Sequence, residues 1–283
     1  MRSTLCTVLA LLCASQADAL VSYSVSNVQT QIVGPGGSAV PGSGSSGNYD
    51  SNTVVGDFAV FDIFGANTEG PDFNAQLRVT YAQDNGGIGS NIMIAQTTNS
   101  QGLTDTGTFS VLMTIGTQGG GARLDFDWFL PGTYTGSTAN FDPETQRINP
   151  AVNFTTFDID FEQFVSVERA AITEYTLNDP TQLTATDNGS TITFSDSGSN
   201  STVTDPTSAA EYLTRPTSSY YVDMGKQVDD GPALFMFEMR DPSDNVTING
   251  PPVNVPEPGS YAALFGLATL ALLGYRRRCV ATT

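Results

Sequence analysis

Alternation of apolar and polar side chains is the feature that most restricts the fold of this chain of 283 residues. Between Arg123 and Leu130, every second residue is apolar and most of the others are charged, a period of two that is typical of a β-strand with one buried face. Three further segments have the same period. The expected core faces are Leu124, Phe126, Trp128 and Leu130; Phe157, Ile159 and Phe161; Phe109, Val111, Met113 and Ile115; and Phe235, Phe237 and Met239.

Turn-forming residues divide these runs into short strands. Asp84-Asn85-Gly86-Gly87 and Asn188-Gly189 each lie between alternating segments and predict β-hairpins, because Asn and Gly tolerate a positive φ. The segment Asp205 to Leu213 instead predicts a short helix, with Asp205 as N-cap and Pro206 at the first helical position. The sequence therefore predicts an all-β fold, a two-layer antiparallel β-sandwich with jelly-roll-like connections and one short helix.

Charge and composition exclude several classes of function. The chain has 29 acidic and 11 basic residues, so it repels phosphate backbones, and nucleic-acid binding is not expected. It contains no histidine, and its cysteines, Cys6, Cys13 and Cys279, lie near the two ends. The central region therefore lacks histidine-dependent triads, cysteine nucleophiles, disulfides and the usual zinc sites. Any general acid or base there must be a carboxylate whose pKa is raised by burial.

The N-terminus has the pattern of an export signal. Arg2 precedes an apolar run, and Ala17 and Ala19 are small residues at the two positions that signal peptidase reads. We expect cleavage after Ala19 and recognition by the export machinery. A lipoprotein acylated at Cys13 is the alternative, although Leu12 stands where a small residue is preferred.

The C-terminus combines a helix breaker, an apolar stretch and a basic cluster. From Val255 the chain reads Val-Pro-Glu-Pro-Gly-Ser, and fifteen mostly apolar residues follow, from Tyr261 to Tyr275. A helix of that length spans about 22 Å, which is short for a hydrocarbon core of about 30 Å. The arginines that follow place the chain end in the cytoplasm and the rest of the protein across the membrane. A plain C-terminal anchor would have the same pattern.

These three parts, in this order, resemble the PEP-CTERM sorting signal of Gram-negative bacteria, a segment that is sometimes labelled an ice-binding protein C-terminal domain. The resemblance implies that the tail is a substrate of exosortase, a membrane transpeptidase-like enzyme, and that the protein is secreted alongside exopolysaccharide. It does not imply that the body binds ice. The motif residues are Val255, Pro256, Glu257, Pro258, Arg276, Arg277 and Arg278. The expected organisation is a signal peptide at 1–19, a β-sandwich domain at 20–249, a Pro-rich spacer at 250–256 and the sorting tail, with a short transmembrane helix, at 257–283.

Two pairs of aspartates are candidate metal ligands. Asp125 and Asp127 lie on the non-core face of one predicted strand, and Asp158 and Asp160 lie on that of another, with about 7 Å between the members of a pair. If these strands paired, the four anions would destabilise the sheet unless a cation neutralised them. Calcium, which takes six to eight oxygen ligands, is the candidate cofactor. The alternative is that the acids only mark the solvent face of their strands.

Tyrosines and glutamates provide the remaining candidate sites. Tyr220 and Tyr221 are adjacent, so one of them should point outward, where it could stack on a sugar ring or simply lie at a strand end. Glu168, Glu174 and Glu238 would be the candidate acids of a glycoside hydrolase.

Taken together, the sequence favours a non-enzymatic exported protein of the cell surface or exopolysaccharide matrix, with a structural or adhesive role and no catalytic residue. The alternatives are a calcium-assisted carbohydrate-binding module and, less favoured, a carboxylate-based glycoside hydrolase.

Overall fold

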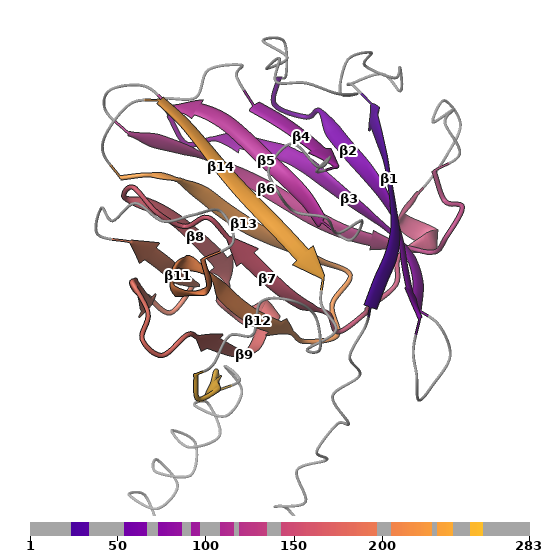
Figure 1. Cartoon of the computed structure of the whole chain (residues 1–283). Helices are drawn as coiled ribbons and strands as arrows, with labels where there is room; N and C mark the ends of the chain where they lie inside the picture. Colours follow the sequence, from indigo (N-terminus) through magenta and orange to yellow (C-terminus); the bar gives the residue numbers. More distant parts are fainter. Residues whose placement is uncertain are drawn as a thin grey trace, which may run out of the picture.

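Two antiparallel sheets stack face to face in the part of the chain that the structure, a computed structural model, describes (Figure 1). The described residues are 24–33, 54–66, 73–86, 92–96, 108–115, 119–134, 143–196, 205–227, 231–239 and 250–256. In order across the first sheet, the strands are β1 (Ser24–Val33), β2 (Phe58–Ala66), β3 (Phe73–Asp84), β6 (Gly120–Phe129), β13 (Ser219–Lys226), β8 (Gln163–Glu168), β11 (Thr191–Asp196) and β10 (Leu183–Asp187).

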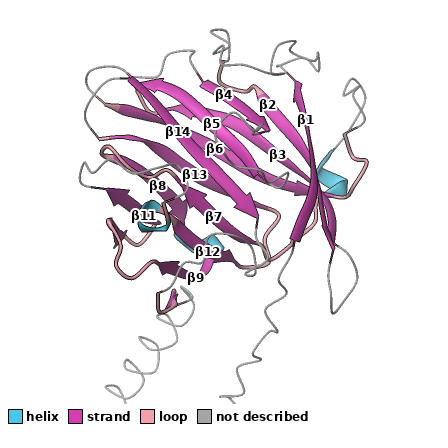
Figure 2. Cartoon of the chain, in the orientation of Figure 1, coloured by secondary structure: helices cyan, strands magenta, loops and turns pink. Residues whose placement is uncertain are grey.

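The second sheet has seven described strands, and short 3-10 turns are the helical elements that the structure describes (Figure 2). In order across this sheet, the strands are β15 (Val253–Asn254), β9 (Ile172–Leu177), β12 (Ala210–Thr214), β7 (Asn153–Phe157), β14 (Gly231–Met239), β5 (Thr108–Ile115) and β4 (Ile92–Gln96). The 3-10 turns are η2 (Pro143–Gln146), η3 (Arg169–Ala171) and η4 (Pro206–Ser208). From β5 to β14, the chain crosses between the sheets at every connection except the β10–β11 hairpin. The predicted two-layer antiparallel sandwich is confirmed.

A cluster of aromatic rings fills the space between the sheets. The Phe126 ring on β6 lies with its centroid 5.3 Å from that of Tyr220 and 5.6 to 6.0 Å from those of Phe237, Phe109 and Phe154. These rings come from both sheets, because Phe109, Phe154 and Phe237 belong to β5, β7 and β14. Each edge-to-face or offset aromatic pair adds about 0.5–1.5 kcal/mol beyond the burial of its apolar area. The aromatic cluster therefore fixes how the two sheets pack on each other.

Two of the predicted core faces end earlier than the alternation of the sequence suggested. β6 ends at Phe129, and Leu130 in the following turn is 45% exposed. β7 ends at Phe157, which packs on the outer side of the second sheet against Ala209 and Met236. The turn after β7 buries Ile159 in the main core and leaves Phe161 43% exposed. The period of two is lost there because the chain leaves the sheet.

One of the two predicted hairpins is confirmed and the other is wrong. β10 and β11 pair antiparallel on either side of Asn188-Gly189, where Gly189 has a φ of 89°. By contrast, β3 pairs with β2 and β6, whereas β4 pairs with β5 in the opposite sheet. The turn chemistry itself is present, since the Gly86 N–H donates to Asp84 Oδ1 over 2.8 Å. Such a turn reverses the chain locally, but it does not determine which strand becomes the partner.

The predicted helix from Asp205 is wrong after its first turn. Asp205 does act as an N-cap, because its Oδ1 accepts from the Thr207 N–H at 2.9 Å. After η4, however, the chain enters β12, in which Tyr212 is fully buried. β12 pairs with both β7 and β9, and this backbone pairing in the middle of a sheet overrides the local helical preference.

The aromatic cluster yields a stability prediction. Phe126→Ala should lower the free energy of unfolding by about 3–5 kcal/mol, because it removes a ring that packs against both sheets and leaves a cavity. Leu130→Ala, four residues further on and 45% exposed, should change it by less than about 0.5 kcal/mol. Urea denaturation followed by tryptophan fluorescence measures both variants. Equal losses in the two variants would contradict the assigned core.

Candidate functional site

The last described segment of the chain is held against the edge of the second sheet. In β15, Val253 lies opposite Tyr175 and Asn254 opposite Glu174 of β9. Gly250 approaches the sheet so closely that a Cβ at this position would overlap the carbonyl oxygen of Leu177. Residues 250–256, which we predicted to be a spacer, therefore lie against the body, because their backbone completes the sheet.

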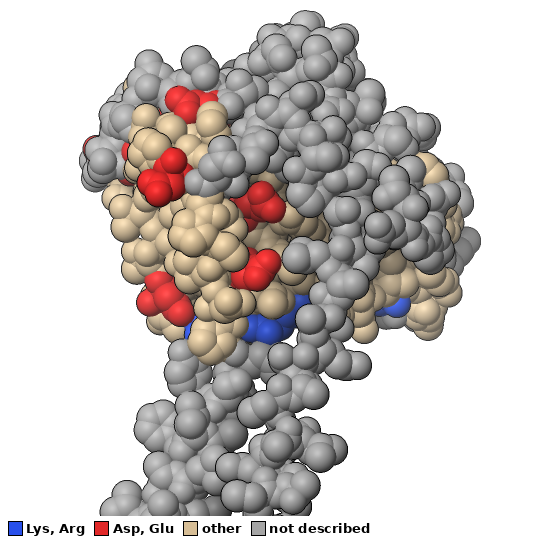
Figure 3. All heavy atoms as spheres, turned by 60° about the horizontal axis from the view of Figure 1, so that its bottom comes forward, with Lys and Arg blue, Asp and Glu red and all other residues tan. Residues whose placement is uncertain are grey.

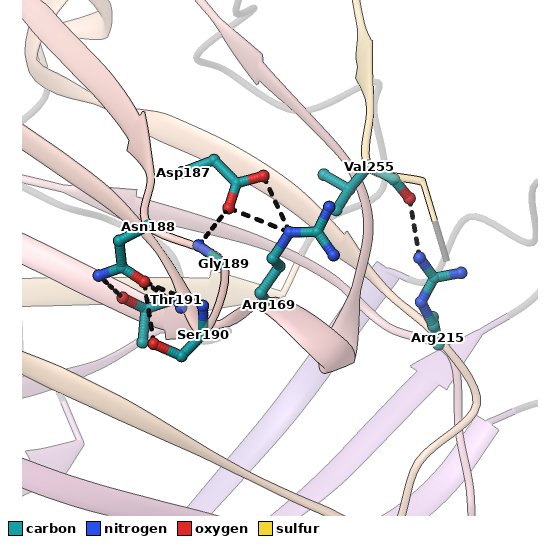
Figure 4. A network of polar contacts seen from close by, with 8 residues as sticks. All are labelled: Arg169, Asp187, Asn188, Gly189, Ser190, Thr191, Arg215 and Val255. Atoms are coloured by element: carbon teal, nitrogen blue, oxygen red, sulfur yellow. Dashed lines mark hydrogen bonds and ion pairs between the residues drawn. The ribbon is translucent and has the colours of Figure 1, made fainter. Parts of the chain in front are cut away.

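Val255 is the point at which this segment is fixed most firmly. Its side chain is 6% exposed and belongs to the main hydrophobic core. Its N–H donates to the carbonyl oxygen of Thr173 over 2.7 Å, and its own carbonyl oxygen accepts from Arg215 Nη2 over 2.8 Å (Figure 4). Burial of a valine is worth about 1.5–3 kcal/mol, and each net hydrogen bond adds about 0.5–1.5 kcal/mol.

Arg215 is itself held by the segment that leads into β9. Its N–H donates to the carbonyl oxygen of Ala171, the last residue of η3, over 2.7 Å. The same turn carries Arg169, whose Nε donates to both carboxylate oxygens of Asp187 at 2.8 and 3.0 Å. The hydrogen bond from Arg169 lowers the pKa of Asp187. Because the N–H of Gly189 also donates to Asp187, the turn between β10 and β11 is tied to η3 (Figure 4).

The base of the body combines basic and acidic side chains. Figure 3, which brings the bottom of Figure 1 forward, shows basic atoms gathered low on the body and acidic groups spread over the surface above them. At the β15 junction, Asp187 neutralises Arg169, whereas Arg215 donates to a neutral carbonyl. The junction therefore binds a segment of backbone by hydrogen bonding and burial.

Residues 254–278 match the model of the PEP-CTERM protein-sorting motif. The match confirms the resemblance predicted from the sequence. The motif begins at Asn254, so its first two residues are those that β9 and the core hold. Sequence reasoning found Val255 and Pro256 but missed the body residues Thr173 and Arg215, since neither lies in a recognisable pattern.

Other predicted parts of the two ends lie outside the described residues. They are the signal peptide with Ala17 and Ala19, the apolar stretch from Tyr261 to Tyr275, and Glu257, Pro258, Arg276, Arg277 and Arg278. In the segments that are described, no helix is long and apolar enough to cross a membrane.

The remaining comparisons concern the body. No curated protein matches this chain. Among solved structures, the N-terminal domain of the Streptococcus gordonii adhesin Sgo0707 is similar over 78% of this chain and 63% of that domain's chain, with 9% identity and a TM-score of 0.38. The likeness is too distant to support an argument about function.

The structure does not bring the four predicted calcium ligands together. Asp125 and Asp127 lie on the outer face of β6 in the first sheet, whereas Asp158 and Asp160 follow β7 of the second sheet. The residues that the structure describes include no group of three or more acidic, histidine or cysteine side chains suited to a metal ion. The expected pairing of the two strands does not occur because the sandwich places them in opposite layers.

Two arginines neutralise Asp127. Arg78 Nη2 and Nε donate to its Oδ2 at 2.6 and 3.2 Å, and Arg147 Nη1 donates to its Oδ1 at 2.6 Å. Burial alone would raise the pKa of Asp127, but these arginines hold it below its ordinary value. Both guanidinium groups lie over the Phe129 ring, and Arg78 also donates to the Tyr134 hydroxyl. Arg78, Arg147 and Asp127 form an arginine–aspartate cluster, in which both carboxylate oxygens of Asp127 take part in ion pairs.

Asp158 and Asp160 form a separate, buried pair. Asp158 is 8% exposed and has a left-handed backbone, with a φ of 65°. Burial, together with the neighbouring Asp160 carboxylate, raises the pKa of Asp158 to about 7. The Gln163 side chain donates to Asp160 Oδ1 over 3.3 Å. Asp158 is therefore a buried carboxylate with a raised pKa, which is the property expected of any general acid or base in the central region of this chain.

The two tyrosines point to opposite sides of β13. Tyr220 is 2% exposed and packs against Phe126, so it is not available to a sugar. Tyr221 lies on the outer face, where the Arg123 guanidinium sits 4.0 Å from its ring centroid. Arg123 in turn donates to the Asp223 carboxylate at 2.8 and 2.9 Å. Arg123 thus covers one face of the Tyr221 ring, so that sugar stacking there would need the opposite face.

The three candidate hydrolase acids lie on three strands. Glu168 ends β8 in the first sheet, while Glu174 and Glu238 belong to β9 and β14 of the second. Strands β12 and β7 separate β9 from β14. The structure therefore does not arrange any two of these glutamates as a cross-strand pair.

The arginine–aspartate cluster predicts a large loss of stability when its acid is neutralised. Asp127→Asn should lower the free energy of unfolding by about 3–5 kcal/mol, because Arg78 and Arg147 would keep their charges without a counter-ion. Asp125→Asn is the matched control, since Asp125 lies two residues away on the same face and its pKa is raised by burial and by Asp127. Chemical denaturation at pH 7 should show no loss for Asp125→Asn. Equal losses for the two variants would rule out the proposed role of the cluster.

Neutralising Asp158 should stabilise the protein at high pH, whereas neutralising Asp127 should destabilise it. The folded protein holds the Asp158 proton up to about pH 7, whereas the unfolded chain releases it near pH 4, so the contribution of Asp158 to stability is lost as the pH rises from about 4 to 7. Asp158→Asn stays neutral and should exceed the wild-type free energy of unfolding by about 1–3 kcal/mol at pH 8, with a much smaller difference at pH 4.

Thermal melting of both proteins at the two pH values provides the measurement. Asp62→Asn, which removes a charge from an exposed position on β2, controls for the change in net charge. A difference between Asp158→Asn and wild type that does not change with pH would contradict the raised pKa.

Proposed function

We propose that this chain is an exported protein of the cell surface or exopolysaccharide matrix, in which the tail directs sorting and the β-sandwich has a structural or adhesive role without catalysis. The observation that carries the proposal is the match to a protein-sorting motif that begins on β15, within the sheet of the body itself. A sorting signal attached to a sandwich in this way suits a protein whose folded body is the cargo.

The route follows from the two ends of the chain. In this proposal the export machinery carries the chain across the inner membrane of a Gram-negative bacterium, and signal peptidase cleaves after Ala19. The short apolar stretch holds the protein in the membrane until an exosortase-type enzyme processes the tail. The body then remains on the outer side, at the surface or in the matrix, and exopolysaccharide is the proposed partner.

The roles of the candidate acids support a body without catalysis. Asp127 is engaged by two arginines, and the glutamates considered for hydrolysis lie on separate strands. Asp158 and Asp160 are close to each other but buried, at 8% and 3% exposure, and a polysaccharide must reach the carboxylates that cleave it. The same positions give no specific support to the alternative of a calcium-assisted carbohydrate-binding module.

Processing of the tail tests the proposal. Protein recovered from the native host should begin at Leu20 and should lack the apolar stretch, with a C-terminus near Glu257, because sorting removes the segment that the membrane holds. Mass spectrometry of the intact protein measures both ends. Recovery of chains that end at Thr283 as the main species would reduce the tail to an ordinary anchor and overturn the proposed sorting.

Incubation of the purified protein with plant, algal and bacterial polysaccharides tests the absence of catalysis. We expect no new reducing ends. Turnover that is lost in Glu168→Gln or Glu238→Gln would favour the hydrolase instead.

A further inference from the structure

We propose that β15 acts as a clasp that withholds the first residues of the sorting motif, so that processing of the tail requires β15 to detach from β9. This inference rests on the proposed function and adds a regulatory contact between the body and its own tail. The edge of β9 is the docking surface, and its occupant is the segment from Gly250 to Val255 of the same chain.

The contacts of Val255 conflict with its recognition by an enzyme. Enzymes and binding domains that take up an extended peptide hydrogen-bond its backbone and place alternate side chains in pockets. In this structure the N–H of Val255 donates to Thr173, its carbonyl oxygen accepts from Arg215, and its side chain is buried in the core. None of these three groups is available to a second protein while the clasp is closed, although the motif includes this residue.

The clasp also sets the length of the tether between the body and the membrane. When it is closed, Val255 is the last residue that the core holds, and five residues, from Pro256 to Ser260, can span at most about 18 Å before the apolar stretch begins at Tyr261. Release of residues 250–255 from β9 adds six residues, or up to about 22 Å. An open clasp therefore gives a membrane enzyme roughly twice the reach between the folded body and the bilayer.

The clasp is built so that it can open without unfolding the sandwich. β15 contains two residues and lies at the edge of its sheet, where it pairs with β9 alone. Val253 is 42% exposed, and Asn254 is exposed as well. Short edge segments of this kind open locally at a much lower free energy than the core strands. The contacts of Val255 and the close approach of Gly250 are therefore the main points of attachment.

A reversible disulfide tests whether the clasp must open. Tyr175→Cys with Val253→Cys joins cross-strand partners, and both positions lie outside the matched motif. Cysteine Cα atoms about 4.4–6.8 Å apart can form a disulfide, a range that includes antiparallel partners. Cys279→Ser is added so that the tail offers no competing thiol.

In the native host, we expect the oxidised variant to be processed at least tenfold more slowly than wild type and to regain the wild-type rate when a reducing agent is added. The reduced form of the same protein is the internal control for the loss of the Tyr175 ring. Processing at the same rate in the oxidised and reduced forms would overturn the proposal.

Two single substitutions should open the clasp while leaving the motif intact. Gly250→Ala places a Cβ against the Leu177 carbonyl, and Arg215→Met removes the donor to Val255. Both should raise the rate of processing several-fold and speed up amide hydrogen exchange at Val255, with no change in exchange in β6 and β13.

Gly132→Ala, at a positive φ in the turn after β6, and Arg123→Met, on the outer face of the first sheet, are the matched controls and should leave the rate unchanged. A slower or unchanged rate in the opened variants, with faster exchange at Val255, would show that the clasp does not withhold the motif. Failure of the proposed function has a different signature, since wild type and every variant would then end at Thr283.

Discussion

Aromatic side chains packed between the two sheets hold this body together. None of the described residues is a cysteine, so no disulfide joins the layers there. The rings around Phe126 come from strands that are far apart in the sequence, and they interlock at centroid distances of 5.3 to 6.0 Å. Each ring contacts several others. Any other relative position of the two layers would therefore lose many of these contacts. Val255 of the C-terminal segment packs into the same core.

The outer face of the first sheet shows how an acidic chain uses its basic residues. Arg78 and Arg147 share Asp127, and Arg123 joins Asp223 while it covers Tyr221. Each guanidinium thus binds a carboxylate and lies on an aromatic ring, which lets a charged group cover apolar surface. Arg78 lies directly opposite Asp127, and Arg123 lies directly opposite Asp223, so both are cross-strand pairs of opposite charge, which stabilise a sheet.

The sequence predicted the features that depend on local pattern. It did not predict strand pairing, which depends on segments that are distant in the sequence. Alternation identified the buried faces of β5 and β14, and the Asn188-Gly189 turn identified a hairpin. The turn at Asp84 was equally clear, yet β3 and β4 went to different sheets, because strand partners are chosen by the packing of the whole core. In the same way, Asp205 capped a turn, but sheet pairing drew the following residues into β12.

For the candidate sites too, the sequence predicted continuous motifs but not contacts between distant residues. The PEP-CTERM motif is a continuous pattern and could be recognised from the sequence, whereas its attachment through Thr173 and Arg215 could not, because these residues lie 40 or more positions from Val255. The aspartate pairs were visible as well. Their separation into opposite layers depended on a strand order that no local pattern encodes.

β15 also has a consequence for the association of this protein with other molecules. Without it, β9 would present a row of unpaired N–H and C=O groups at the edge of the second sheet, and such an edge pairs readily with strands of other molecules. If the tail is cut near Glu257, as proposed, β15 remains, and the body would keep this edge covered. Val253 and Asn254 of β15 would then protect the body from edge-to-edge aggregation.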